Sequence, residues 1–274
     1  MVDRTGAIVT VWGSRGDLPC AGPEYVRFGG NTACLSVEMG GRLFVFGAGT
    51  GLRVLGNMLI ASEKLLDIDI FLTHSHLDQI QGIPFFKPFY NPKNRVRIWA
   101  GHLGGRGGLH GAIAGMMRAP LFPIPPSFFT AAVDYRDFAP GTRLDLQDDF
   151  FLSSCAMDRV DGATGYRLDL PDGHSIAVLP LAKGWDDAAL VTLCRDVDML
   201  IADNPADAGL PALHALAAAA RVGRLVLTCH APDQDDGALT RLAHRAEGGT
   251  PPLHLAREGA VSYTHLTLPT KRIV

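Results

Sequence analysis

One short segment constrains the fold and the chemistry of this chain more than any other. Residues 69–73, Asp-Ile-Phe-Leu-Thr, have the apolar character of a buried strand, and the next five residues are His-Ser-His-Leu-Asp. In an extended segment, alternate residues face the same side, so the side chains of His74, His76 and Asp78 can meet at one point. Imidazole and carboxylate groups both bind zinc, and the motif therefore predicts a metal site at the end of a strand. The alternative is a loop of solvated polar residues in which Asp78 begins a helix.

Composition limits the class of protein to which the chain can belong. Its 274 residues are 47% hydrophobic and 19% charged, which predicts a well-buried α/β domain of one large core. The net charge of -3 gives no electrostatic reason to expect nucleic acid or an anionic membrane as a partner. No apolar stretch is long enough to span a bilayer, and residues 1–4 do not resemble a signal peptide, so we expect a cytoplasmic protein.

The cysteines indicate neither a disulfide framework nor a thiolate cage for zinc. Their number is odd, their spacing is wide and no CxxC pair occurs. Most are expected to be small buried residues. They are Cys20, Cys34, Cys155, Cys194 and Cys229.

Hydrophobic patterning predicts two groups of strands with helices between and after them. Two sheets packed face to face, with helices outside, would satisfy this order. The glycine- and proline-rich segment 101–129 is expected to cover a cleft, or else to be a mobile surface loop. The strands are expected at 7–12, 33–39, 43–46, 68–73, 96–100, 150–156, 164–170, 175–179, 199–202 and 225–228, and the helices at 52–62, 186–194, 211–221 and 235–245.

The last fourteen residues fit nothing before them. Segment 261–274, which contains His265, resembles a translated sequencing adaptor. We therefore predict a single domain over residues 1–260 and a non-native tail over 261–274.

Several segments together resemble the metallo-β-lactamase superfamily, and within it the branch of ribonuclease Z and cyclic-nucleotide phosphodiesterases. The resemblance implies a four-layer αββα sandwich with its metal site along one edge. It also implies the family motif His-x-His-x-Asp-His, in which the first two histidines hold one ion and the last two residues hold a second. The matching segments are 11–16, 29–32, 48–52, 73–82, 165–167 and 225–228.

The chain departs from this family pattern at the expected ligands. Gln79 stands where the motif has its third histidine, and an amide is a poorer zinc ligand than imidazole. Gly47 replaces an aspartate that orients the motif, and Arg159 aligns with a further ligand histidine. A guanidinium cannot ligate a cation and would repel one. We therefore hypothesise that Arg159 pairs with Asp78 and substitutes for the charge of the metal; a surface arginine is the alternative.

Two more ligand positions fall in the second half of the chain. The bridging aspartate of the family aligns with Leu181, while Asp203 is interpreted as a residue that begins a turn. The last ligand histidine aligns with Cys229, next to His230. Each of these two residues has an ordinary alternative, as a buried thiol and as a capping or surface histidine.

These observations lead to two hypotheses of different classes. The first is a bacterial hydrolase of phosphodiesters or related esters, with one zinc, manganese or iron ion. The second is an inactive relative that binds a ligand or partner in the former cleft. A corrupted gene sequence is a third explanation, and proteins of this fold often self-associate, which leaves a homodimer open. In the hydrolase, the metal ligands would be His74, His76 and Asp78, with Cys229 or His230 as a fourth; Asp78 would also be catalytic, and Gln79, Arg159 and Arg15 would line the cleft.

Overall fold

The computed structural model describes residues 6–62, 64–104, 107–159, 161–181, 183–185, 187–205, 209–246 and 248–264. Within these residues, the chain forms two seven-stranded mixed sheets. The first sheet has the order β14-β1-β2-β3-β4-β5-β6. Its strands are β1 (Ile8–Gly13), β2 (Cys34–Met39), β3 (Arg42–Phe46), β4 (Asp67–Leu72), β5 (Arg95–Ala100), β6 (Ala132–Asp137) and β14 (Val261–Tyr263).

The second sheet has the order β13-β12-β11-β10-β9-β8-β7. Its strands are β7 (Arg143–Asp145), β8 (Phe151–Met157), β9 (Ala163–Asp169), β10 (Ser175–Leu179), β11 (Met199–Asp203), β12 (Leu225–Thr228) and β13 (Leu253–Leu255). The helices are α1 (Gly51–Ala61), α2 (Leu77–Ile80), α3 (Gly108–Met116), α4 (Ala188–Leu193), α5 (Leu210–Ala219) and α6 (Asp236–Arg245), with short 3-10 turns at Pro23–Tyr25, Ile83–Phe85, Lys87–Tyr90 and Pro126–Phe128.

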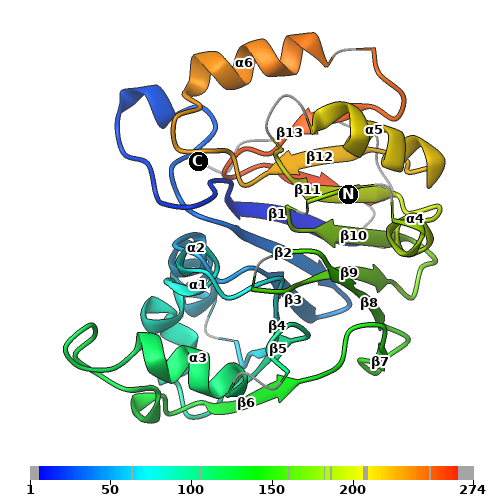
Figure 1. The fold of residues 1–274 in the computed structure, drawn as a ribbon. Helices are drawn as coiled ribbons and strands as arrows, with labels where there is room; N and C mark the ends of the chain where they lie inside the picture. The colour runs from blue at the N-terminus through cyan, green and yellow to red at the C-terminus, as the bar shows by residue number, and fades with distance from the viewer. Residues whose placement is uncertain are drawn as a thin grey trace.

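The two sheets pack face to face, and helices cover the outer face of each (Figure 1). Alternation along the strands produces these layers, because successive side chains point to opposite faces. In β4, Ile68, Ile70 and Leu72 pack toward α1 and α3, while Phe71 packs between the sheets. In the second sheet, Leu179 and Leu200 pack toward α4 and α5. The αββα architecture predicted from the sequence is confirmed.

A tight hairpin at Gly40-Gly41 joins β2 to β3. Met39 pairs with Arg42, and both glycines have positive φ angles of 59° and 81°. A two-residue turn of this kind needs that conformation at both positions, which glycine adopts without strain.

Segment 101–129 contains a helix that the sequence did not predict. Its middle forms α3, and Leu109 and Ile113 of this helix are fully buried against the first sheet. The glycine-rich composition obscured this helix, because glycine is a poor helix former. The helix therefore belongs to the core, with apolar contacts that outweigh its weak intrinsic propensity.

The end of the described chain also differs from the prediction. Val261–Tyr263 form β14 and pair antiparallel with β1, and the backbone N–H of Ala7 donates to Thr264 Oγ1 at 3.1 Å. Residues 261–264 are therefore part of the first sheet, although the sequence set them apart from the domain. His265 and the rest of the tail lie outside the described residues.

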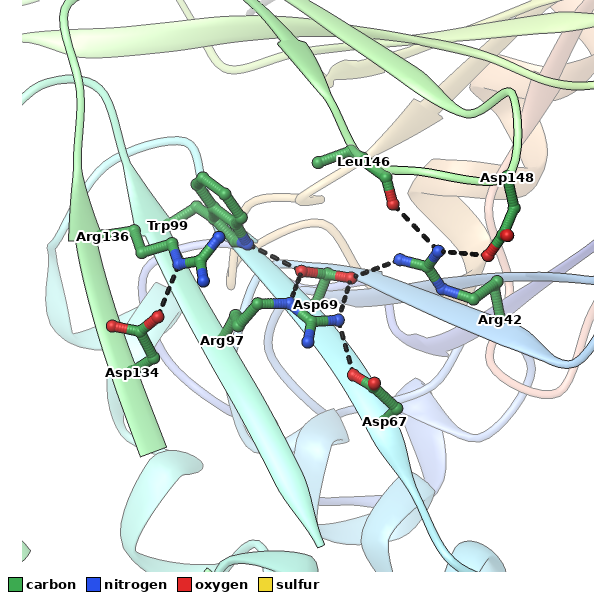
Figure 2. Close-up of polar contacts among 9 residues, drawn as sticks. All are labelled: Arg42, Asp67, Asp69, Arg97, Trp99, Asp134, Arg136, Leu146 and Asp148. Carbon is green, nitrogen blue, oxygen red and sulfur yellow. Dashed lines mark hydrogen bonds and ion pairs between the residues drawn. The ribbon is translucent and has the colours of Figure 1, made fainter. Parts of the chain in front are cut away.

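A buried carboxylate links neighbouring strands of the first sheet (Figure 2). Asp69 on β4 is 1% exposed and lies between Arg97 of β5 and Arg42 of β3. Arg97 donates from Nε and Nη2 at 2.6 and 2.8 Å, Arg42 donates from Nη2 at 3.1 Å, and Trp99 donates from Nε1 at 2.8 Å. Arg42 also donates to Leu146 O in the second sheet's first hairpin, so the cluster joins the two sheets.

Parallel strands bring the segments that follow them to one edge of the sandwich. β3 to β6 are mutually parallel, as are β10 to β13. The backbone N–H of Thr164 at the start of β9 donates to Thr73 O after β4, which joins the sheets at this edge. None of the described helices has the length and apolar character that crossing a bilayer requires.

Candidate metal centre

The side chains of His74, His76 and Asp78 converge at the carboxyl end of β4. One potential ligand atom of each lies within 4.8 Å of the others. The chain leaves β4 at Leu72, and α2 begins at Leu77, so the two histidines occupy the extended connection and Asp78 the first helical turn. His74 and Asp78 are buried, while the side chain of His76 is 43% exposed.

His74 is held as a neutral imidazole with one nitrogen available. Its Nδ1 lies 3.0 Å from Thr73 Oγ1, and its buried Nε2 has no hydrogen-bond partner among the described residues. Burial, together with the positive charge of Arg159, lowers the pKa of His74 to about 2. Metal-bound histidines are usually oriented in this way, by a hydrogen bond at the ring nitrogen that does not bind the metal.

Asp78 faces the free nitrogen of His74. Its Oδ1 lies 3.9 Å from His74 Nε2, and its Oδ2 accepts a hydrogen bond of 3.4 Å from Gln79 Nε2. Burial raises the pKa of Asp78, whereas the Gln79 amide opposes the shift by stabilising the carboxylate. Gln79 therefore turns its donor toward Asp78, and its own buried Oε1 has no partner among the described residues.

Gly47 lies directly behind Gln79, where the family has an aspartate. Its φ angle is 78°, and a Cβ atom there would lie 2.8 Å from both Ala33 O and Gln79 Oε1. A side chain at position 47 is therefore excluded while Gln79 keeps this conformation.

The ligand cluster opens into a cavity of about 440 Å³ with an acidic wall. Four carboxylates face a single guanidinium, that of Arg159, and the segments after six different strands contribute to the lining. The lining residues are Gly16, Asp17, His74, Asp78, Arg159, Leu181, Asp203, Asn204, Pro205, Cys229, Ala231, Asp233 and Gln234.

Asp203 is the residue that sequence reasoning most underestimated. It ends β11, and its Oδ2 accepts a hydrogen bond of 2.9 Å from the backbone N–H of Leu181. Burial, and to a smaller extent the nearby charge of Asp78, raises the pKa of Asp203 to about 6. The carboxylate thus faces the cavity, and the interpretation as a turn-forming residue missed this. The available signal was its place at the carboxyl end of a parallel strand, a position that in α/β sheets commonly faces a ligand.

The two candidates for a fourth ligand behave differently. Cys229 lines the cavity, with its backbone in the left-handed region at φ 51°. Burial, followed by the charge of Asp203, raises the pKa of the Cys229 thiol well above its ordinary value. The thiol is consequently protonated without a bound cation, and would have to lose its proton to become a ligand.

His230 points away from the cavity. Its Nε2 lies 3.0 Å from Ala256 O and its Nδ1 lies 3.2 Å from Asn204 Nδ2, so both ring nitrogens are engaged. Burial lowers the pKa of His230 to about 4. The candidate ligand role of His230 is therefore incompatible with this structure, and the ring connects the β12 loop to the C-terminal segment.

Arg15 is also placed differently from the expectation that it lines the cleft. Its side chain is fully buried, donating from Nε to Gly29 O at 2.7 Å and from Nη1 to Gln234 O at 2.6 Å. The guanidinium carbon lies 4.8 Å from the centre of the Tyr25 ring. Arg15 holds the loop that carries Gln234, and its own side chain is not part of the cavity wall.

Arg159 points into the cavity, but its contact differs from the hypothesised pair with Asp78. Its Nη2 lies 3.1 Å from His76 Nδ1, and its Nη1 donates to Leu181 O at 3.3 Å. On the opposite side of the same imidazole, His76 Nε2 lies 3.2 Å from Asp161 Oδ2. Asp161, which follows Arg159 by two residues in the loop between β8 and β9, was not predicted as a site residue.

The donor set fits one cation better than two. His74 Nε2 is free and buried, Asp78 Oδ1 faces it, and the acidic wall favours a positive charge. A second ion would depend on Gln79, Cys229 and Asp203, of which the first is a weak ligand and the second is protonated.

No sequence-family profile and no curated protein sequence matches this chain. Solved structures do match it across nearly its whole length. The metallo-β-lactamase fold protein YhfI from Bacillus subtilis shares 16% identity at a TM-score of 0.67, covering 94% of this chain and 99% of that one. Human tRNase Z, short form, shares 20% identity at a TM-score of 0.63, covering 94% and 100%. The Zn²⁺-bound PqqB from Methylobacterium extorquens shares 12% identity at a TM-score of 0.66, covering 93% and 99%.

Proposed function

Since this chain has the metallo-β-lactamase fold, we propose that it is a hydrolase with one metal ion in the cleft at the end of β4. The ligands would be His74, His76 and Asp78, with Cys229 as a fourth candidate. The single observation that carries the proposal is the convergence of these three side chains within 4.8 Å, one of them with a free buried nitrogen. A buried polar atom without a partner is costly, and a bound ion would remove that cost.

The charge of the cavity supports a cation in the same place. Asp17, Asp78, Asp203 and Asp233 all line it, and like charges crowded in a partly desolvated space destabilise one another. An anionic substrate would enter such a cavity against repulsion unless a cation were bound first.

A divalent ion held there would supply Lewis-acid polarisation of an ester and acidify a water molecule. The protein's own groups would then orient that chemistry. Gln79 holds Asp78 by its Oδ2 and leaves Oδ1 toward His74. Arg15 and Asn204 position Gln234, whose loop forms the far wall.

The substrate we propose is a phosphodiester or a related ester, and the ion is zinc, manganese or iron. A tRNase among the structural neighbours supports the phosphodiester class. Imidazole and carboxylate donors suit all three metals, so the ligands alone do not select among them. We also propose that the protein is bacterial and cytoplasmic, with a homodimer left open as its assembly.

A second candidate function is that of an inactive relative that binds a ligand in the former cleft. One observation favours it: the guanidinium of Arg159 lies against His76, where a cation would have to bind. Such a protein would fold and bind its ligand without metal.

Metal analysis of the purified protein separates the two candidates. We expect about one equivalent of zinc, manganese or iron by plasma mass spectrometry, and we expect His74→Ala to lose it. His110→Ala is the control and should retain the metal, because His110 lies on α3. Chelation should abolish hydrolysis of bis(p-nitrophenyl) phosphate and lower the melting temperature. A cooperatively folded protein without metal, indifferent to chelator, would instead establish the inactive relative.

A further inference from the structure

Both ring nitrogens of His76 already have partners in the protein. A guanidinium can only donate, so His76 Nδ1, 3.1 Å from Arg159 Nη2, must be the unprotonated nitrogen. His76 Nε2 then carries the hydrogen and donates to Asp161 Oδ2 at 3.2 Å. The two contacts hold the imidazole in one tautomer and leave no lone pair for an ion.

The two partners of His76 have opposite effects on metal binding by this residue. A carboxylate on one ring nitrogen is the usual companion of a metal on the other, because it fixes the tautomer and strengthens the donor. Asp161 therefore prepares His76 to bind through Nδ1. Arg159 occupies that same nitrogen with a positively charged group that cannot itself be a ligand.

From this geometry we propose that Arg159 is a built-in competitor of the metal ion. Its guanidinium takes the cation's place on His76 Nδ1, and an ion completes its ligand set only when the guanidinium moves away. This inference rests on the proposed function, since it takes His76 as one of the ligands.

The surroundings of Arg159 suit such an exchange. Its tether is weak, because Nη1 makes one hydrogen bond of 3.3 Å to Leu181 O and the buried Nε has no partner among the described residues. Burial raises the pKa of both Asp78 and Asp203, and the charge of the guanidinium partly opposes that increase at each carboxyl. The guanidinium thus partly balances the acidic wall when no ion is bound, and this balancing charge becomes superfluous once a dication binds.

Zinc affinity in paired variants tests the proposal. Arg159→Gln removes the competing charge and keeps a shorter, polar side chain, whereas Asp161→Asn replaces the carboxylate that prepares His76 with a neutral amide. Arg118→Gln is the matched control, because Arg118 is exposed, does not line the cavity and undergoes the same change of charge. Each full-length protein would be stripped of metal, checked for folding by circular dichroism, and titrated with Zn²⁺ against a chromophoric chelator.

We expect Arg159→Gln to bind Zn²⁺ at least about tenfold more tightly than the unmodified protein, since a charge-assisted hydrogen bond no longer has to break. Asp161→Asn should bind about tenfold or more weakly, and Arg118→Gln should be unchanged. Opposite shifts from two partners of one imidazole are not expected from a general loss of structure.

Zinc affinity that is equal or weaker in Arg159→Gln would overturn the competitor role while leaving the metal site intact. Binding in Arg159→Gln but not in the unmodified protein would support the competitor role and refute the proposed metallohydrolase. An absence of binding in both would refute both. Nitrogen chemical shifts of His76 in the metal-free protein give a second measurement, because the proposal requires an unprotonated Nδ1.

Discussion

The buried carboxylate of Asp69 offers the sharpest test of how the first sheet is held together. Asp69→Asn keeps the size of the side chain but replaces one acceptor oxygen with an N–H₂ group. Four donated hydrogen bonds currently converge on the two oxygens, three of them from arginines. The amide nitrogen would therefore face guanidinium donors, and buried positive charge would lose its counterion (Figure 2).

The size of the stability loss depends on the ion pairs that each arginine retains in Asp69→Asn. Breaking a buried ion pair on one side typically costs about 3–5 kcal/mol. Arg97 retains Asp67 at 2.5 Å and Arg42 retains Asp148 at 3.0 Å, and the two arginine side chains are 12% and 15% exposed. We therefore place the loss at the lower end, about 3 kcal/mol of unfolding free energy. For a domain of this size that corresponds to roughly 6 °C or more in melting temperature.

Urea unfolding followed by circular dichroism measures the loss, with Asp134→Asn as the matched control. Asp134 pairs with Arg136 at 2.6 Å on the same sheet, but these side chains are 52% and 42% exposed. Exposed pairs contribute at most about 1 kcal/mol. If Asp69→Asn costs no more than Asp134→Asn, the argument that burial makes this cluster important for stability is wrong.

Two further predictions concern the buried side chains of Arg15 and His230. Arg15→Lys should lower the free energy of unfolding by about 2 kcal/mol or more, because an ammonium group cannot reach both Gly29 O and Gln234 O, and a buried carbonyl without a donor is destabilising. Zinc affinity in the same variant should change far less than in Asp161→Asn. An unchanged stability would contradict the role given to Arg15. The pKa of His230 is about 4 in the folded protein and 6.5 in the unfolded chain, so between these pH values the unfolded chain binds the extra proton. His230 therefore lowers the free energy of unfolding as the pH falls from about 6.5 to 4, by up to about 1.4 kcal/mol per pH unit. Metal-free His230→Gln should therefore be less stable than the unmodified protein at pH 7 and lose part of that difference by pH 5, measured as the difference between two urea titrations; a difference independent of pH would mean that the buried ring is not held neutral.

The fold was largely predictable because its strands alternate and its turns carry their usual residues. β1 to β5 and β8 to β12 all lie within a few residues of the expected ranges. β10 is an exception to the alternation, because both of its faces are buried and it reads as a short, nearly continuous apolar run. All four edge strands were missed: β7, β13 and β14 have three residues each, too few to show a period, and the six-residue β6 is mostly exposed with three charged side chains. α3 was missed because its glycines conceal a helix that tertiary packing stabilises.

The local geometry of the candidate site was predictable from the sequence, whereas its long-range contacts were not. His74, His76 and Asp78 are neighbours in sequence, so strand geometry alone brings them together. Asp203 and Asp161 join them only through the packing of two sheets, which no local pattern records. The directions in which the side chains of Arg15 and His230 point could not be predicted either, because each side chain contacts a carbonyl oxygen of a distant loop.

The hydrogen bond between Ala7 and Thr264 makes the two ends of the described chain spatial neighbours. A short linker could therefore join them, and the chain could be reopened elsewhere as a circular permutant. The exposed turn at Asp172 and Gly173, between β9 and β10, is suitable for new ends because it lies outside the cavity wall. In such a permutant β14 and β1 would be adjacent in sequence, and the edge strand that now closes the first sheet from the far end of the chain would form through a local hairpin.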